Sequence, residues 1–170
     1  AAENSSFEMA SMLIAKGADV ARSGASGDLP LIVTARKGCL PLAEMLISKG
    51  AKVDARDEES GETALIAAIQ AAYIDLAELL IEEGADVKIT CQGGRSLFLL
   101  AAYRGHYAAV IYLHGKGFSL NESDRLGQTA MHFAASDSVE TLYILGYLIE
   151  RDENVSAKDS SGTTPLMFAS

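Results

Sequence analysis

The chain has 170 residues, a formal net charge of −9 and 49% hydrophobic residues. This acidic balance disfavours a general nucleic-acid-binding protein, because such proteins are typically basic. No apolar run approaches the roughly 18 residues of a membrane-spanning helix, so we expect no membrane insertion. The hydrophobic content, with no low-complexity segment, predicts a folded chain.

A unit of about 33 residues recurs along the whole sequence. Its first marker is a turn glycine, followed two positions later by Thr or Ser and then by a short apolar run. That glycine stands at Gly27, Gly61, Gly94, Gly127 and Gly162. A second marker, Gly17-Ala18-Asp19-Val20, returns in similar form at Gly50 and at Gly84. A period sustained in this way predicts stacked repeats rather than one irregular globule.

In chain order, residues 1–23 form a partial repeat. Full repeats are predicted at 24–57, 58–90, 91–123 and 124–158, and residues 159–170 begin another. Because both ends fall inside a unit, we expect the chain to be a fragment of a longer array, in which neighbouring repeats cover the end faces.

Each unit is predicted to hold two helices. Hydroxyl side chains at Thr63, Ser96, Thr129 and Thr164 can cap the first helix, whereas Leu29 cannot. Gly38 and Gly105 allow the chain to reverse into the second helix. Small pairs such as Ala101-Ala102 allow close packing. The second helix carries an apolar stripe at helical spacing, which is expected to be buried: Leu42, Met45, Leu46, Leu76, Leu79 and Leu80.

These residues resemble the ankyrin repeat family. Pieces of its pattern stand in Thr129-Ala130-Met131-His132, in Thr164-Pro165-Leu166, in Gly105-His106 and in Gly84-Ala85-Asp86-Val87. The resemblance covers essentially the whole chain. It implies an all-α ankyrin-repeat solenoid of stacked helix-turn-helix units with short β-hairpin loops, as one continuous domain. It also implies that His132 ties a helix to a hairpin.

No catalytic or metal-binding pattern stands out, so we expect no enzyme activity, no cofactor and no metal. Cys39 and Cys91 lie in different repeats and are not expected to pair, which favours a cytoplasmic location, with a nuclear one possible. The acidic runs Asp57–Glu59 and Glu82-Glu83 are interpreted as solvated charge. Asp124 and Asp159 are expected to make local turn hydrogen bonds.

The predicted function is non-catalytic: a scaffold that binds a segment of another protein across a concave groove. In ankyrin-like arrays the hairpin tips and the residues after the small pair face this groove. The main candidates are Arg36, Lys37, Glu59, Glu62, Gln70, Arg95, Tyr103, Arg104, Arg125, Leu126 and Gln128. The wider groove adds Ser26, Asp28, Arg56, Gln92, Asp137 and Lys158.

The groove positions together carry seven basic and four acidic residues in an otherwise acidic chain. We therefore expect an acidic or phosphorylated partner segment, because Arg forks favour carboxylate and phosphate oxygens. Two alternatives stay open: a regulatory ankyrin segment that packs in cis within a larger enzyme or channel, and a structural spacer.

Asn121 is a candidate for modification. Leu113 lies eight positions before it, which resembles the ankyrin-repeat asparagine accepted by the factor-inhibiting asparaginyl hydroxylase, although Ser119 replaces the usual acid two positions before it. The alternative is that Asn121 only makes hydrogen bonds within its hairpin.

Overall fold

The computed structural model describes residues 2–24, 27–136, 139–151 and 154–169. The chain divides into two compact units, Ala1–Val87 (unit 1) and Lys88–Ser170 (unit 2), and each is considered by itself. Over the described residues the regular structure is helical, and the β-structure is one isolated bridge between Ser123 and Thr129. The predicted all-α class is confirmed. The repeat boundaries and the single continuous domain stay predictions.

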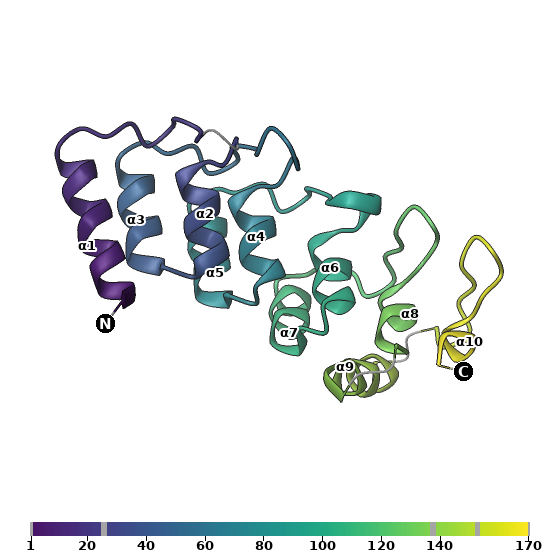
Figure 1. Cartoon of the computed structure of the whole chain (residues 1–170). Coiled ribbons are helices and arrows are strands. Elements are labelled where there is room, and N and C mark those ends of the chain that lie inside the picture. Colours follow the sequence, from purple (N-terminus) through teal and green to yellow (C-terminus); the bar gives the residue numbers. More distant parts are fainter. Residues whose placement is uncertain (1, 25–26, 137–138, 152–153, 170) are drawn as a thin grey trace. The chain divides into compact units, whose positions relative to one another are not determined.

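Unit 1 contains five helices within its described residues: α1 (Ala2–Ala15), α2 (Pro30–Lys37), α3 (Leu40–Ser48), α4 (Ala64–Gln70) and α5 (Ile74–Glu82). The first helices of successive repeats, α2 and α4, pack against each other. The second helices form the other layer, in which α3 contacts both α1 and α5 (Figure 1). Each repeat therefore adds one helix to each layer.

Unit 2 repeats this arrangement after a short 3-10 turn, η1 (Gln92–Gly94). Its described helices are α6 (Leu97–Tyr103), α7 (Tyr107–Gly115), α8 (Ala130–Ala134), α9 (Val139–Ile149) and α10 (Pro165–Phe168). The first helices α6, α8 and α10 follow one another, and α7 packs beside α9 (Figure 1).

The first helices form the core. Residues Ala64–Ile69 of α4 and Leu97–Ala102 of α6 are all buried, which explains why these segments are apolar on every side. The small pairs lie at these buried positions, including Ala101-Ala102. Neighbouring helices can therefore approach closely where those residues meet.

The helix caps agree with the sequence at three of four positions. Thr63 Oγ1 and Ser96 Oγ each accept a bond of 3.3 Å from the backbone N–H three residues later. Thr129 forms a reciprocal capping box with His132. Thr164 makes no side-chain cap bond to α10, so that prediction was wrong. The four-residue α10 instead begins with backbone bonds to the Thr164 carbonyl.

His132 has the tying role that the resemblance implied. Its Nδ1 accepts from the Thr129 N–H at 3.1 Å, and its Nε2 lies 3.1 Å from the Thr163 carbonyl in the next hairpin. Because a carbonyl only accepts, Nε2 carries the hydrogen and Nδ1 is the acceptor. The fully buried ring thereby joins two successive repeats.

The turn between the two helices of a repeat needs a residue in the left-handed backbone conformation, with a positive φ. Gly38 and Gly105 have φ angles of 71° and 74°, as predicted. The last repeat of unit 1 places Ala72 there, at φ 59°, and it is the one described non-glycine residue with a positive φ. An L-residue is strained in this region, so this turn stores a local cost.

The second helices are less buried than their apolar stripes predict. Leu46, Leu76 and Leu80 are buried, but Leu42, Met45 and Leu79 are partly exposed. The expectation that the whole stripe is buried was therefore wrong. These helices lie on the outside of the stack, so only the side that faces the first helices is fully covered.

The hairpin loops, called fingers below, occupy residues 57–62, 91–95, 124–128 and 159–163, and the ends of a further one are Gly24 and Asp28. Each is closed by a backbone hydrogen bond of 2.8 to 3.0 Å between its ends. Asp124 and Asp159 accept bonds from backbone N–H groups inside their fingers, as predicted.

Asp57 does the same. The prediction that its side chain is solvated was wrong, because the side chain is buried. It is only 4% exposed, and its Oδ1 accepts from the Glu59 and Ser60 N–H groups and from the Ser60 hydroxyl. The bonds from Ser60 lower the pKa of this carboxyl below its ordinary value. Asp57 is therefore part of the finger's internal structure, whereas Glu58 and Glu59 are exposed.

Candidate protein-binding surface

The fingers of unit 2 are joined by backbone contacts. The Arg125 N–H donates to the Gly93 carbonyl at 3.0 Å, and the Ser160 N–H donates to the Leu126 carbonyl at 2.8 Å. Gly94 has a φ of 76°, and a Cβ there would lie 2.7 Å from Arg125 Cγ. A glycine is thus required where the Arg125 side chain crosses the preceding finger.

Arg95 anchors an aromatic cluster behind these fingers. Its guanidinium lies 4.1 Å from the centroid of the Tyr103 ring and 5.1 Å from that of Phe133. The two rings meet edge to face at 5.4 Å. Arg95 Nε also lies 3.4 Å from Oδ2 of Asp124, which is buried. Arg95 is therefore held on both sides and fixes the Tyr103 ring.

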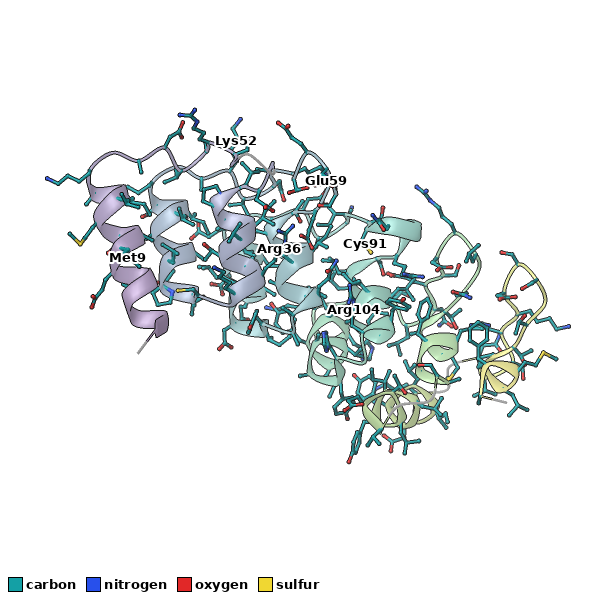
Figure 2. The ribbon with its side chains drawn as sticks, viewed as in Figure 1. Met9, Arg36, Lys52, Glu59, Cys91 and Arg104 are labelled. Carbon is teal, nitrogen blue, oxygen red and sulfur yellow. The ribbon has the colours of Figure 1, made fainter. Side chains whose placement is uncertain are left out.

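The exposed residues of this region define the unit 2 surface. Tyr103 is 51% exposed although its ring is packed, and Leu126 at a finger tip is 57% exposed. Arg104, which follows α6 and is labelled in Figure 2, and Arg125 are also exposed. The surface thus combines a fixed aromatic ring, an apolar tip and two guanidinium groups.

The predicted groove residues of unit 1 are arranged differently. Arg36, at the end of α2 (Figure 2), contacts Asp28 Oδ1 at 2.6 Å and Glu62 Oε2 at 2.7 Å. The hydrogen bonds to Glu62 and to Asp28 raise the pKa of this guanidinium. Arg36 was predicted to bind an acidic partner, but two carboxylates of this chain already neutralise its positive charge.

Other predicted residues lie at scattered positions. Lys37 and Glu59 are exposed, and Gln70 and Gln128 are partly exposed. Arg56 donates to the Gly61 carbonyl at 3.1 Å, in the finger that follows it. Among the remaining groove residues, Gln92 and Lys158 are exposed, while Ser26 and Asp137 lie outside the described residues.

Asn121 lies in the loop that follows α7. Its side chain is exposed, and its backbone N–H donates to Ser119 Oγ at 3.2 Å. Hydroxylation of this residue stays a prediction. Incubation with the oxygenase, iron and 2-oxoglutarate should add the mass of one oxygen to the Asn121 peptide, and an unchanged mass would end the hypothesis.

The sequence did not reveal two features of the unit 2 surface. The Phe133 ring, from the next repeat, packs against Tyr103. Asp124 accepts a hydrogen bond in its own finger through Oδ1, and its Oδ2 lies beside Arg95. Phe133 looks like any core residue in sequence, and Asp124 was read as a turn residue alone. The spacing of 30 between Tyr103 and Phe133, close to one repeat, was the available signal.

The thiol of Cys91 lies beside this surface, with Sγ 3.4 Å from the Arg95 carbonyl. Burial raises the pKa of this thiol, which makes it a weaker nucleophile at neutral pH. Cys39 and Cys91 are both free thiols. Among the described helices, none has the length and apolar character needed to cross a bilayer.

Comparison with known proteins agrees with this geometry. The family model for ankyrin repeats (3 copies) matches residues 1–91 and 97–170. A 53-residue part of the chain is 36% identical to the ankyrin repeat protein L271 of Acanthamoeba polyphaga mimivirus; the match spans 31% of this chain and 7% of that protein. Ankyrin repeats are in general protein–protein interaction modules. The chain therefore belongs to the ankyrin repeat family.

Proposed function

We propose that this chain is a protein-binding scaffold and that its unit 2 surface holds a segment of the partner. One observation carries the proposal: Tyr103 stays half exposed although Arg95 and Phe133 fix its ring. A ring that is already immobilised loses little conformational freedom on binding. Tyr and Arg are also the residues most enriched at binding hot spots.

Leu126 extends the surface towards the finger tips. The finger is closed by backbone bonds and by the Asp124 carboxylate, so its fold does not require an apolar side chain at the tip. The exposed leucine and the fixed aromatic ring, both in unit 2, each offer a place for an apolar side chain of the partner. The partner segment therefore carries at least one apolar residue opposite Tyr103 and Leu126.

The charge of the partner segment is proposed from the exposed arginines. The anion-binding role is assigned to Arg104 and Arg125, because both are exposed and are the sequence neighbours of Tyr103 and Leu126. Their guanidinium groups suit a carboxylate or a phosphorylated side chain. We propose an acidic or phosphorylated segment with an apolar anchor. A role for the unit 1 residues stays a prediction, as does packing in cis within a larger protein.

The test uses peptides selected from a random display library on the 170-residue chain. Selected peptides should combine an aliphatic or aromatic residue with acidic residues, and their affinity should fall with ionic strength. The double substitution Arg104→Glu and Arg125→Glu should weaken binding by about a hundredfold, because opposite charges become like charges.

The matched control is the double substitution Lys16→Glu and Lys49→Glu. Both lysines are exposed in unit 1, and the change in net charge is the same. If both double variants weaken binding equally, only the overall charge matters and the proposed surface is wrong. Binding that resists both salt and the Arg104/Arg125 reversal would also reject it.

A further inference from the structure

The guanidinium of Arg95 is held at one edge and on its face. At the edge, Nε lies 3.4 Å from Oδ2 of Asp124, whose side chain is only 1% exposed. On the face, Cζ lies 4.1 Å from the centroid of the Tyr103 ring and 5.1 Å from that of Phe133. A carboxylate and two aromatic faces all attract a cation. The position of this guanidinium is therefore set before a partner binds.

The other end of the same guanidinium is open. Its Nε is buried without a hydrogen bond, whereas its two terminal nitrogens reach the surface and have no acceptor among the described residues. Gly93 adds no side chain over this end, where a Cβ would lie 3.8 Å from Arg95 Cζ and 4.0 Å from one terminal nitrogen. Arg95 thus presents unused donors next to the half-exposed Tyr103 ring.

Asp124 holds Arg95 by charge rather than by a hydrogen bond. Neither Arg95 Nε nor Asp124 Oδ2 makes a hydrogen bond within the described residues, and both atoms are buried. Buried polar atoms without such a bond are rare and call for a reason. The other oxygen, Oδ1, accepts from the N–H groups of Leu126 and Gln128 at 2.9 and 3.0 Å. The finger therefore fixes the carboxylate, and the carboxylate orients the arginine.

The charge balance decides what the open end of Arg95 accepts best. Asp124 already balances its positive charge. A second carboxylate would place two negative groups on one partly buried cation, whereas a carbonyl oxygen accepts the same hydrogen bonds without adding charge. The unbalanced positive charge beside this finger belongs to Arg125, whose side chain crosses it at Gly94.

We propose that Arg95 binds the partner directly, and that its two terminal nitrogens donate hydrogen bonds to a main-chain carbonyl of the partner segment. Asp124 is the positioning residue that orients the guanidinium. This role rests on the binding function assigned above to the unit 2 surface, and it adds the conformation of the segment. Carbonyls inside a helix are already bonded within that helix, so the segment is extended where it meets Arg95.

The packing of Arg95 also places this carbonyl along the partner segment. The guanidinium lies over the Tyr103 ring, which is the proposed contact of the apolar anchor residue. The carbonyl therefore belongs to that anchor residue or to one of its two neighbours in the segment. The anion of the segment lies further along, where it meets Arg104 and Arg125.

The experiment is an ester scan of one peptide selected on the 170-residue chain. Each main-chain amide is replaced in turn by an ester, whose carbonyl is a weaker hydrogen-bond acceptor, and the dissociation constant is measured by calorimetry. One position, at the anchor residue or next to it, should lose about fivefold in affinity. A scan without a sensitive position there overturns the proposal.

Arg95→Lys identifies the donor. Lysine keeps a positive charge beside Asp124 but replaces the planar fork by a single ammonium group. This variant should bind the all-amide peptide about tenfold more weakly. The sensitive ester should then cause no further loss, because both changes remove the same hydrogen bonds. If this ester weakens binding equally in the parent chain and in Arg95→Lys, another group contacts the carbonyl and the proposal is wrong.

Asp124→Asn tests the positioning role, and Asp159→Asn is its matched control. Both aspartates accept backbone N–H bonds within a finger, and asparagine can accept the same bonds. Asp124 is the one of the two that contacts Arg95. In NMR spectra of the chain without peptide, Asp124→Asn should accelerate solvent exchange of the Arg95 Nε hydrogen by about tenfold, and Asp159→Asn should leave it unchanged. Equal rates in both variants would overturn the role of Asp124.

Two results separate this contact from the proposed function. A peptide that is weakened by the Arg104/Arg125 reversal but shows no ester effect dependent on Arg95 leaves the binding surface in place and overturns the main-chain contact alone. If no library peptide binds the chain, the proposed function fails and the contact fails with it.

Discussion

The second helices of the two units pack inward in the same way and differ on their outward sides. In unit 1, α3 and α5 expose charged residues such as Glu44, Asp75 and Glu82. In unit 2, α7 and α9 expose Tyr107, Ile111, Leu142 and Tyr143. The inward residues of both units are the same small and aliphatic types. Stacking therefore dictates the inner side of a repeat and leaves the outer side free for other contacts.

The finger sides show the same contrast. In unit 1, Arg36 is held by Asp28 and Glu62. In unit 2, Arg95 is used to fix an exposed tyrosine. Both arginines occupy predicted groove positions, but only the second produces an apolar surface suited to a partner. The residues of the neighbouring repeat therefore decide whether an arginine at a groove position is neutralised within the chain or supports an exposed surface.

The largest expected effect tests whether the two units lose stability separately. Leu80→Ala in unit 1 and Leu113→Ala in unit 2 remove fully buried side chains, and each should cost about 2–5 kcal/mol. Because repeats couple mainly to their neighbours, hydrogen exchange should rise first in the unit that carries the substitution. A uniform loss of protection along the chain from either variant would contradict this.

A smaller loss of stability is expected when the hydrogen bonds of His132 are removed. Unit 1 has no histidine at this position. Ile32 and Ile66 occupy the position of His132 in unit 1. His132→Leu keeps an apolar side chain but removes the bonds to Thr129 and Thr163, so it should cost about 1–3 kcal/mol in chemical denaturation. An unchanged unfolding midpoint would show that the tie adds nothing.

The next prediction stabilises unit 1. Ala72 has a φ of 59° at the turn where the repeats before and after it use Gly38 and Gly105. Ala72→Gly should relieve this strain and raise the free energy of unfolding by about 0.5–1 kcal/mol, after the added freedom of the unfolded chain is subtracted. Gly105→Ala in unit 2 is the reverse experiment and should destabilise. If both substitutions destabilise, the strain at Ala72 is absent.

The smallest expected effect is a pH dependence of folding stability, which arises from one finger in each unit. Hydrogen bonds from Ser60 lower the pKa of Asp57, and the Ser161 hydroxyl and backbone bonds lower that of Asp159. A depressed folded-state pKa means that the stabilisation is fully present above the unfolded value of about 3.9 and is lost as the pH falls below it. Asp57→Asn should therefore flatten the acid limb of stability measured from about pH 5 down to pH 2. A variant with the same acid limb as the parent would refute this.

The sequence predicts the helix pairs and the turn glycines, because these depend on spacing within one repeat. The family resemblance implied the tying role of His132, which reaches the hairpin of the next repeat. It does not reveal that Asp57 is buried, since burial there depends on how the finger closes around its carboxylate. It also overstates the burial of Leu79, because periodicity does not distinguish a helix covered on one side from one covered all round.

The candidate surface was predictable only in part. Tyr103, Arg104, Arg125 and Leu126 are exposed, as groove positions should be. The pairing of Arg36 with two carboxylates, and of Arg95 with Asp124, depends on side-chain directions across repeats. A count of charges along the sequence does not include these pairings. It therefore overestimated the number of basic groups available to a partner.

The most direct test compares matched finger tips of the two units. Leu126→Ser in unit 2 and Glu59→Ser in unit 1 both replace exposed tip residues by the same small polar side chain. Binding of one selected peptide to both variants should be measured by calorimetry. The account predicts that Leu126→Ser weakens binding by about tenfold or more, while Glu59→Ser leaves it unchanged. Equal losses, or a loss confined to Glu59→Ser, would contradict the assignment of the binding surface to unit 2.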